Sequence, residues 1–180
     1  MKVIIFTVFA ICCVLVNSFH IQSATYEDFP NKCSDEINMS PFARIGQKYY
    51  IVEATEKLSW FGAAHFCRTM DANLATIETA DEMHAISQHL VSLGYTHEKW
   101  FWLSGNDLTT EGKFEWLSTG KSMDYTKWSA GQPDNNGGHE NCVHLWRHAA
   151  EFYMNDWQCN QKAHYICEAN TPKTLAITMW

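Results

Sequence analysis

The chain contains an oxygen-rich stretch that reads Gln132-Pro133-Asp134-Asn135-Asn136-Gly137-Gly138-His139-Glu140-Asn141-Cys142. Six of its side chains carry a carbonyl or carboxylate oxygen: Gln132, Asp134, Asn135, Asn136, Glu140 and Asn141. Calcium takes about six to eight oxygen ligands in irregular geometry, whereas zinc and copper prefer histidine or cysteine. The alternative interpretation is a common Asn/Gly turn with solvated charges.

A second oxygen-bearing pair, Asn155-Asp156, lies just before Cys159. If Cys142 and Cys159 form a disulfide, the bond brings this pair close to the first stretch. Amide carbonyls and carboxylates from two segments could then surround one hard cation. The flanking cysteines and the second pair therefore favour a calcium site over a simple turn.

Sequence patterns around these segments predict strands and one long loop. Short aromatic or β-branched runs separated by Gly, Asn and Asp are typical of strands. They occupy residues 49–52, 100–103, 114–117, 142–146 and 164–167. Residues 118–141 contain few aliphatic side chains. A loop of this length in a compact domain is usually functional or disordered, which agrees with a binding loop.

Two helices are predicted in the first half of the chain. Ser59 is a suitable N-cap for a helix that runs to Met70, in which apolar positions recur at helical spacing and Cys67 faces the core. Thr79 and Glu82 form a capping-box pattern at the start of the second helix. Helices followed by strands predict an α+β domain.

The first residues predict a secretory signal peptide over 1–18. Lys2 precedes an apolar run that ends at Val16, and small residues follow. We expect cleavage after Ser18, with Ala24 as a second option, and therefore a secreted, extracellular protein. A transmembrane anchor is the alternative, but the run is too short to cross the hydrocarbon core of a bilayer comfortably.

The composition limits the classes of partner. The formal net charge of the 180 residues is −7, and loss of Lys2 with the signal peptide makes the mature chain more acidic. This charge argues against nucleic acid and anionic membrane surfaces as partners. A hydrophobic content of 46% also excludes disorder as the overall state.

Export would place the cysteines in an oxidising compartment, where disulfides persist. The chain has seven, of which Cys12 and Cys13 leave with the signal peptide. The remaining five are Cys33, Cys67, Cys142, Cys159 and Cys167. An odd number leaves one without an intrachain partner, and any four allow three connectivities.

Residues 42–169 resemble the C-type lectin domain. The resemblance rests on the shared order and spacing of short motifs: Cys67 in the first helix, Trp102-Leu103 before a Gly and an Asp, Gln132-Pro133-Asp134, Glu140-Asn141-Cys142, Asn155-Asp156 before Cys159, and Tyr165-Ile166-Cys167-Glu168. The sequence is most similar in character to the galactose-type soluble lectins of insects. The chain then divides into a signal peptide (1–18), an N-terminal arm (19–41), a carbohydrate-recognition domain (42–169) and a C-terminal tail (170–180).

The resemblance implies a C-type lectin-like fold, with two helices, a small twisted antiparallel sheet and long, disulfide-stapled calcium-binding loops. It implies the disulfides Cys67–Cys167 and Cys142–Cys159. It also implies a cis peptide bond before Pro133. The sugar-site calcium would be bound by Gln132, Asp134, Glu140, Asn155 and Asp156. A sugar offers two neighbouring hydroxyls to the ion and hydrogen-bonds four of the same residues: Gln132, Asp134, Glu140 and Asn155.

The resemblance also bears on the kind of sugar. In the family, Gln-Pro-Asp goes with galactose-type sugars and Glu-Pro-Asn with mannose-type sugars, so we expect galactose or N-acetylgalactosamine. Strong galactose binders often carry an aromatic residue soon after the motif, and residues 135–138 offer none. Trp128 and His139 are the nearest substitutes, although we expect each to be structural. Met154 replaces the family's usual Trp and can fill the same apolar gap.

An auxiliary calcium site of the family aligns with Asp107, Glu111, Asn135 and Asn141. Two of these are amides where the family often has carboxylates, and fewer negative charges predict weaker binding.

The N-terminal arm carries two further features. Cys33 either links two chains in a disulfide homodimer or stays a free or capped thiol. Asn38-Met39-Ser40 matches the glycosylation acceptor pattern, and the following Pro41 is expected to lower its use.

Two other functions compete with a lectin. The first is a protein-binding module that has the same fold and no sugar ligand. The second is a hydrolase that uses Asp134 and Glu140 as a carboxylate pair, although calcium ligation would occupy both. The spacing of His144 and His148 along a strand does not favour a transition-metal site. We therefore expect a non-enzymatic, calcium-dependent lectin that recognises microbial or self glycans, as in innate immunity.

Overall fold

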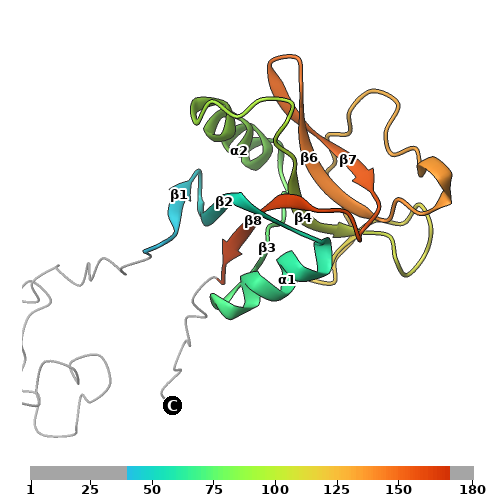
Figure 1. Ribbon diagram of the computed structural model, residues 1–180, viewed down its shortest axis with the longest axis horizontal. Coiled ribbons are helices and arrows are strands. Elements are labelled where there is room, and N and C mark those ends of the chain that lie inside the picture. The colour runs from blue at the N-terminus through green and yellow to red at the C-terminus, as the bar shows by residue number, and fades with distance from the viewer. Residues whose placement is uncertain (1–39, 171–180) are drawn as a thin grey trace, which may run out of the picture. The chain divides into compact units, whose positions relative to one another are not determined.

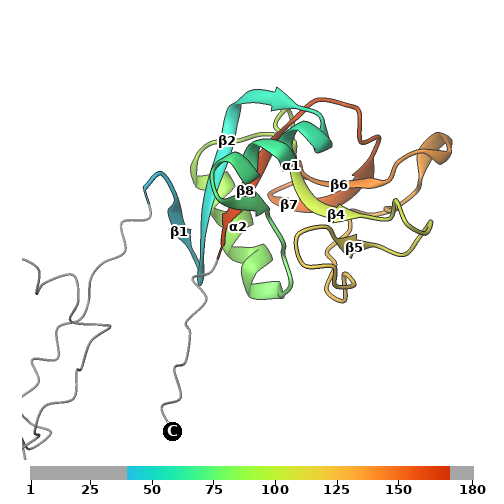
Figure 2. The same ribbon diagram turned by 90° about the horizontal axis from the view of Figure 1, so that it is seen from below.

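The computed structural model describes residues 40–170 and forms the α+β fold that the sequence predicts (Figures 1 and 2). The predicted signal peptide, Cys33, Asn38, most of the N-terminal arm and the tail after residue 170 lie outside the described residues. The elements in chain order are β1 (Ala43–Ile45), β2 (Lys48–Leu58), α1 (Trp60–Thr69), β3 (Ala72–Leu74), α2 (Ala80–Ser92), β4 (Phe101–Asn106), β5 (Glu115–Trp116), the 3₁₀ turn η2 (Asn136–Gly138), β6 (Cys142–His148), β7 (Glu151–Trp157) and β8 (Ala163–Ala169).

The strands belong to one sheet. Its order is β1-β2-β8-β4-β6-β7, with β3 paired to β8 and β5 paired to β4. All neighbours run antiparallel except β4 and β8, which run parallel where Phe101 and Trp102 lie opposite His164 and Tyr165. Strand β4 therefore joins the β2–β8 half of the sheet to the β6–β7 hairpin.

The two helices cover opposite faces of this sheet (Figure 1). Helix α1 places Trp60 in one buried cluster together with Tyr165. Helix α2 places Ile86 in a second buried cluster together with Ile166. Tyr165 and Ile166 are successive residues of β8, and successive side chains of a strand point to opposite faces. The core is therefore two apolar layers with the sheet between them.

Local capping explains where both helices begin. The Ser59 hydroxyl accepts a hydrogen bond from the Gly62 N–H at 3.2 Å, and the Thr79 hydroxyl accepts one from the Glu82 N–H at 3.2 Å. The Glu82 carboxylate accepts from the N–H of Glu78, one residue before the position that a standard capping box would use. Both predicted helices are confirmed. Neither has the length and apolar character needed to cross a bilayer.

Both predicted disulfides are present. Cys67–Cys167 joins α1 to β8 across 100 positions, and Cys142–Cys159 joins the start of β6 to the segment after β7 across 17 positions. The second bond therefore holds the open end of the β6–β7 hairpin, beside the oxygen-rich segments. These disulfides and the element order confirm the predicted C-type lectin-like fold.

Candidate calcium and sugar site

The β6–β7 hairpin positions the second oxygen-bearing pair. In its register, Val143 lies opposite Asp156 and His144 lies opposite Asn155. Asp156 is therefore on the face that α2 covers, and Asn155 is on the other face. The loop from residue 129 to 141 folds back against this end of the hairpin, because the N–H of Ser129 donates to the Met154 carbonyl at 2.9 Å.

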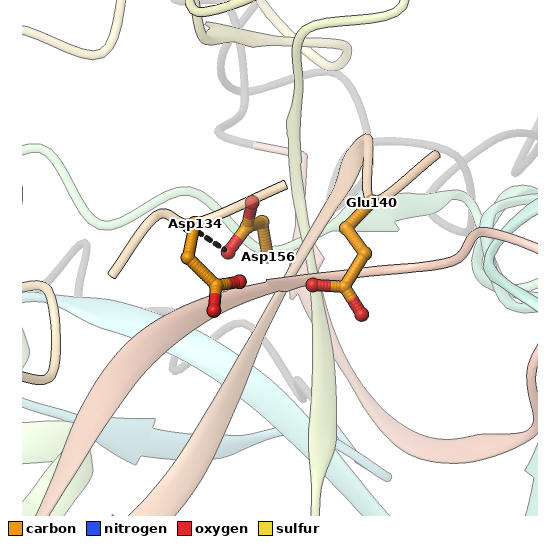
Figure 3. A group of neighbouring side chains, drawn as sticks. All are labelled: Asp134, Glu140 and Asp156. Carbon is orange, nitrogen blue, oxygen red and sulfur yellow. Dashed lines mark hydrogen bonds between the residues drawn. The ribbon is translucent and has the colours of Figure 1, made fainter. Parts of the chain in front are cut away.

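Three carboxylates converge between the loop and the hairpin (Figure 3). Ligand oxygens of Asp134, Glu140 and Asp156 all lie within 4.8 Å of one another. Asp134 is exposed, whereas Glu140 and Asp156 are buried. None of the ion pairs within residues 40–170 involves these three groups. The cluster concentrates negative charge that no basic side chain of the described chain balances.

Backbone N–H groups of the loop hold two of these carboxylates in place. The two oxygens of Asp156 accept from the N–H groups of Asp134 at 3.2 Å and Asn135 at 2.8 Å. Glu140 accepts from the Asn136 N–H at 3.2 Å, and its own N–H donates to the Asn135 side-chain oxygen at 3.0 Å. The loop is thus folded around Glu140 and Asp156, and its N–H groups hold both carboxylates in place.

The environment disfavours negative charge on the buried members. Burial raises the pKa of Glu140, the Asn136 N–H lowers it in part, and the neighbouring Asp156 and Asp134 raise it further. Burial also raises the pKa of Asp156, although the N–H groups of the loop lower it in part. A divalent cation among the three would offset both burial and repulsion.

Two amide side chains complete the predicted ligand set. Asn155 is 8% exposed, and its Oδ1 is buried without a hydrogen-bond partner. A buried acceptor left unpaired is costly, so this oxygen fits a cation ligand. Gln132 is half-buried, precedes a cis bond to Pro133, and accepts from the Asp134 N–H at 3.1 Å through Oε1.

His144 contacts this set, which the sequence analysis did not predict. Its Nε2 lies 3.0 Å from Asn155 Nδ2, and the residue is only 1% exposed. The ring stacks on Trp100 and packs against Trp146 and Trp157. Burial lowers the pKa of His144 to about 4, so the ring is neutral at physiological pH. The contact exists because the β6–β7 register places His144 opposite Asn155. In the sequence, the alternating apolar residues Phe152 and Met154 were the available signal for strand β7.

The auxiliary set is less completely assembled. Asp107 is buried, with one oxygen accepting from the Gly112 N–H at 2.8 Å and the other unpaired. Its N–H donates to the Asn141 carbonyl at 3.1 Å. Glu111 is exposed, and the side-chain oxygen of Asn135 already accepts from Glu140. The three-carboxylate cluster includes neither Asp107 nor Glu111.

The two aromatic substitutes suggested by the sequence lie in different settings. Trp128 is half-buried against Phe114, with ring centroids 4.9 Å apart, and forms an isolated bridge with Met154. His139 is exposed next to η2. Trp128 is therefore a packing residue that supports the loop, as expected.

Comparisons with known proteins agree with this fold. The family model described as "Lectin C-type domain" matches residues 56–169. The chain is 38% identical over 168 residues to "C-type lectin 37Da" of Drosophila melanogaster, covering 89% of this chain and 86% of that protein. It is 40% identical over 115 residues to "Perlucin" of Haliotis laevigata, covering 64% of this chain and 72% of that protein.

Solved structures show the same likeness. The carbohydrate-recognition domain of mouse scavenger receptor C-type lectin superposes with a TM-score of 0.62 at 31% identity, covering 72% of this chain and 95% of that domain. Proteins of the matched family bind carbohydrate, are not enzymes, and generally bind calcium. Because the family model spans more than half of the chain and a relative matches most of its length, the chain belongs to the C-type lectin family.

Proposed function

We propose that this protein is a secreted, calcium-dependent lectin that binds galactose-type sugars. The observation that carries the proposal is the cluster of Asp134, Glu140 and Asp156, whose oxygens lie within 4.8 Å of one another without a basic partner. Two of the three, Glu140 and Asp156, are buried, and buried carboxylates without a basic partner or a cation are costly.

The donor set suits calcium better than other cations. It would consist of side-chain oxygens of Gln132, Asp134, Glu140, Asn155 and Asp156. All are hard oxygen ligands, and amides are mixed with carboxylates, as calcium sites in proteins allow. The unpaired Oδ1 of Asn155 gains a partner in this arrangement. Calcium bound here supplies open coordination positions for two neighbouring hydroxyls of a sugar.

The same side chains would select the sugar. Each hydroxyl at the site needs a hydrogen-bond donor or acceptor besides the ion. Carboxylates only accept hydrogen bonds and amide nitrogens only donate them, so the order of these side chains determines which hydroxyl arrangement fits. The order Gln132-Pro133-Asp134 puts the amide before the proline and the carboxylate after it. The family resemblance associates this order with galactose-type sugars, and the reverse order of charge with mannose-type sugars.

A glycan array tests calcium dependence and sugar type together. We expect binding to glycans with terminal galactose or N-acetylgalactosamine in millimolar calcium, and loss of all binding in chelator. The double variant Gln132→Glu/Asp134→Asn keeps the total charge and reverses its order, so it should shift binding toward mannose-type glycans. Hits confined to mannose-type glycans for the unaltered protein would reject the galactose proposal.

The same preparation separates the lectin from its rivals. A protein-binding module would be retained on no sugar column, with or without calcium. A hydrolase would turn over chromogenic galactosides after calcium removal and would lose that turnover in Asp134→Asn. Retention on immobilised galactose with elution by chelator, and no turnover, is the result that we expect.

Four further expectations belong to this proposal. Residues 1–18 would direct export, which N-terminal sequencing of protein from a culture medium can test. A weaker second calcium site would be formed by Asp107, Glu111, Asn135 and Asn141, supported by the unpaired buried oxygen of Asp107.

The N-terminal arm carries the other two expectations. Cys33 would link two copies of the chain, so a non-reducing gel should show a dimer. Asn38 would carry a glycan in only part of the molecules.

A further inference from the structure

One face of strand β7 carries an aromatic ring on either side of a candidate calcium ligand. Successive residues of a strand point to opposite faces, so Tyr153, Asn155 and Trp157 share one face of the sheet. This is the face of the buried cluster that contains Trp60, against which Trp157 packs. Positions two apart on a strand are about 7 Å apart. Asn155 therefore lies between two aromatic rings of its own strand.

The loop runs along the edge of β7 toward Trp157, which is the last residue of the strand. Trp128 forms a parallel bridge with Met154. Further along the loop, the Asn135 N–H donates to the Asp156 carboxylate at 2.8 Å. The three carboxylates of the candidate site therefore gather at the end of β7 where Trp157 lies.

The two rings differ in what already covers them. Lys127 Nζ lies 4.7 Å from the centroid of the Tyr153 ring and pairs with Glu151 at 2.6 Å. No lysine or arginine of the described residues lies over the Trp157 ring. Trp157 is partly exposed, although it packs against the core. It is therefore the ring that a ligand beside the carboxylates can reach.

Neighbouring rings hold Trp157 in place. Its centroid lies 4.7 Å from that of Trp100 in an edge contact and 5.6 Å from that of Trp102 in a tilted contact. Trp102 is fully buried, and its Nε1 donates to the Leu58 carbonyl at 3.0 Å. A side chain that is already fixed loses little conformational freedom when a ligand packs against it.

We propose that Trp157 helps to select the sugar, because its indole ring packs against the apolar side of the sugar that is bound at the calcium. The inference rests on the proposed function for the ion and the sugar. Residues 135–138 of the loop carry no aromatic ring, so strand β7 supplies the ring that the loop lacks.

The shape of galactose suits this contact. Its hydroxyl at carbon 4 is axial, which leaves the C–H groups of carbons 3, 4 and 5 on one side of the ring. These C–H groups form an apolar surface that can pack on an aromatic face. In mannose the same hydroxyl is equatorial and interrupts that surface. A contact with Trp157 therefore favours galactose-type sugars over mannose-type sugars.

The first test uses the unaltered protein with methyl galactoside and saturating calcium. An isotope-filtered NOE spectrum should connect the indole protons of Trp157 with the protons on carbons 3, 4 and 5 of the sugar. The same sugar protons should shift upfield, because an aromatic ring shields protons that lie over its face. A bound sugar without any contact to Trp157 would overturn the inference.

The second test compares substitutions by chemical-shift titration with methyl galactoside at saturating calcium. Trp157→Leu keeps an apolar side chain and removes the ring, so affinity should fall about three- to tenfold, the range of one aromatic contact. Trp157→Phe keeps a ring and should retain most of the affinity. The ratio of the affinities for methyl galactoside and methyl mannoside should fall in Trp157→Leu as well.

Trp146→Leu is the matched control. Trp146 is also partly exposed and packs against Trp100. The β6–β7 register places it opposite Tyr153, on the side of Asn155 away from the carboxylates. This variant should keep both the galactoside affinity and the sugar ratio. A purely structural role for Trp157 would give the same result in Trp157→Leu, namely lower stability with unchanged sugar binding.

The outcomes separate the inference from the proposed function, with calcium binding measured independently by calorimetry. If the unaltered protein binds calcium and the galactoside, and Trp157→Leu binds the galactoside equally well, the role of Trp157 is wrong and the calcium site stands. If the unaltered protein binds no calcium or no sugar, the proposed function fails and this role fails with it. Should Trp157→Leu not fold, the NOE spectrum of the unaltered protein decides.

Discussion

The two disulfides of this protein lie in one buried apolar cluster, but each borders a region that is built in a different way. Around Cys67–Cys167, the neighbours are apolar and buried, among them Trp60, Leu74 and Tyr165. Around Cys142–Cys159, the loop makes its hydrogen bonds to the carboxylates of Glu140 and Asp156. The side chains of the first region pack against other side chains of the protein and need no ligand. The second retains surplus negative charge and an unpaired amide oxygen.

This contrast shows which part of the molecule depends on a ligand. Apolar burial stabilises the first region whether or not calcium is present. The loop region gains its last stabilisation from a cation, so its stability should follow calcium concentration by mass action. Substitutions in the two regions should therefore differ in their dependence on calcium.

Removal of each disulfide should give the largest effect on stability. In the chain-entropy model, a loop of about 100 residues contributes about 4.7 kcal/mol and a loop of about 15 residues contributes about 3 kcal/mol. We expect Cys67→Ala/Cys167→Ala to lower the free energy of unfolding more than Cys142→Ala/Cys159→Ala in urea titrations with chelator. Only the second pair should also weaken calcium binding, and equal calcium affinity in both variants would contradict the contrast.

Loss of one carboxylate should weaken calcium binding without disturbing the core. Asp134→Asn keeps the shape of an exposed side chain and removes one of three negative charges, so we expect at least about a 100-fold fall in affinity, or about 2.8 kcal/mol. Asp124→Asn is the matched control, because Asp124 is also exposed on the connection between β5 and β6. A calorimetric titration of both variants checks this, and a similar fall in the control would indicate a non-specific charge effect.

Acid should reduce the stability that calcium adds to the protein. The pKa values of Glu140 and Asp156 are raised in the folded, calcium-free chain. These two groups therefore add to the free energy of unfolding in chelator as pH falls through the window between their pKa values and the ordinary values of about 4. His144, whose pKa burial lowers to about 4, subtracts from it as pH falls below about 6.5, with and without calcium alike. Calcium affinity should fall over the same window, by up to about tenfold per pH unit for each competing proton. Thermal melts from pH 7 to 4, with and without calcium, measure both slopes. Parallel slopes would mean that these carboxylates do not bind the ion.

The smallest effect should come from a helix cap far from the loop. Thr79→Ala removes the hydroxyl that accepts from the Glu82 N–H, and such a change typically costs about 1 kcal/mol. The loss should be the same in calcium and in chelator, with calcium affinity unchanged. Denaturation curves in both solutions test this, and a calcium-dependent loss would mean that α2 and the loop are coupled.

The elements that the sequence predicted best depend on neighbouring residues. Ser59 and Thr79 lie within one turn of the N–H groups that they cap, so the beginnings of α1 and α2 could be read locally. The β-type run that was predicted over 49–52 lies within β2, and Gly46 at a φ of +63° forms the turn between β1 and β2. A glycine permits such a turn within an otherwise extended segment.

The features that could not be predicted from the sequence depend on residues that are far apart in the chain. The parallel pairing of β4 with β8 brings together segments about 60 residues apart, and no local pattern specifies it. The residues alone left three disulfide connectivities open, and only the family resemblance selected the pair that is present. Strand β7 was missed because Asn155 and Asp156 resemble a polar loop, although the buried Phe152 and Met154 alternate with the more exposed Glu151 and Tyr153.

The candidate site was therefore predicted in composition but not in orientation. The oxygen-bearing residues could be counted along the chain, and Asp134, Glu140 and Asp156 do converge. The Asn155 amide lies 3.0 Å from His144 Nε2, on the opposite strand. Such a relation appears only once the register of the hairpin is known.

The neighbouring positions of β1, β2 and β8 have a consequence for how copies of the domain can be displayed. Ala43 pairs with Tyr50, and Tyr50 lies opposite Glu168, so the described chain enters and leaves at one corner of the sheet. In both ribbon views η2 lies at the far end of the fold from β1 (Figures 1 and 2). A support or fusion partner attached near residue 40 or 170 would leave residues 132–140 facing outward. An array of domains anchored at that corner would hold many loops at high effective concentration above one surface, where weak individual contacts add up to firm adhesion.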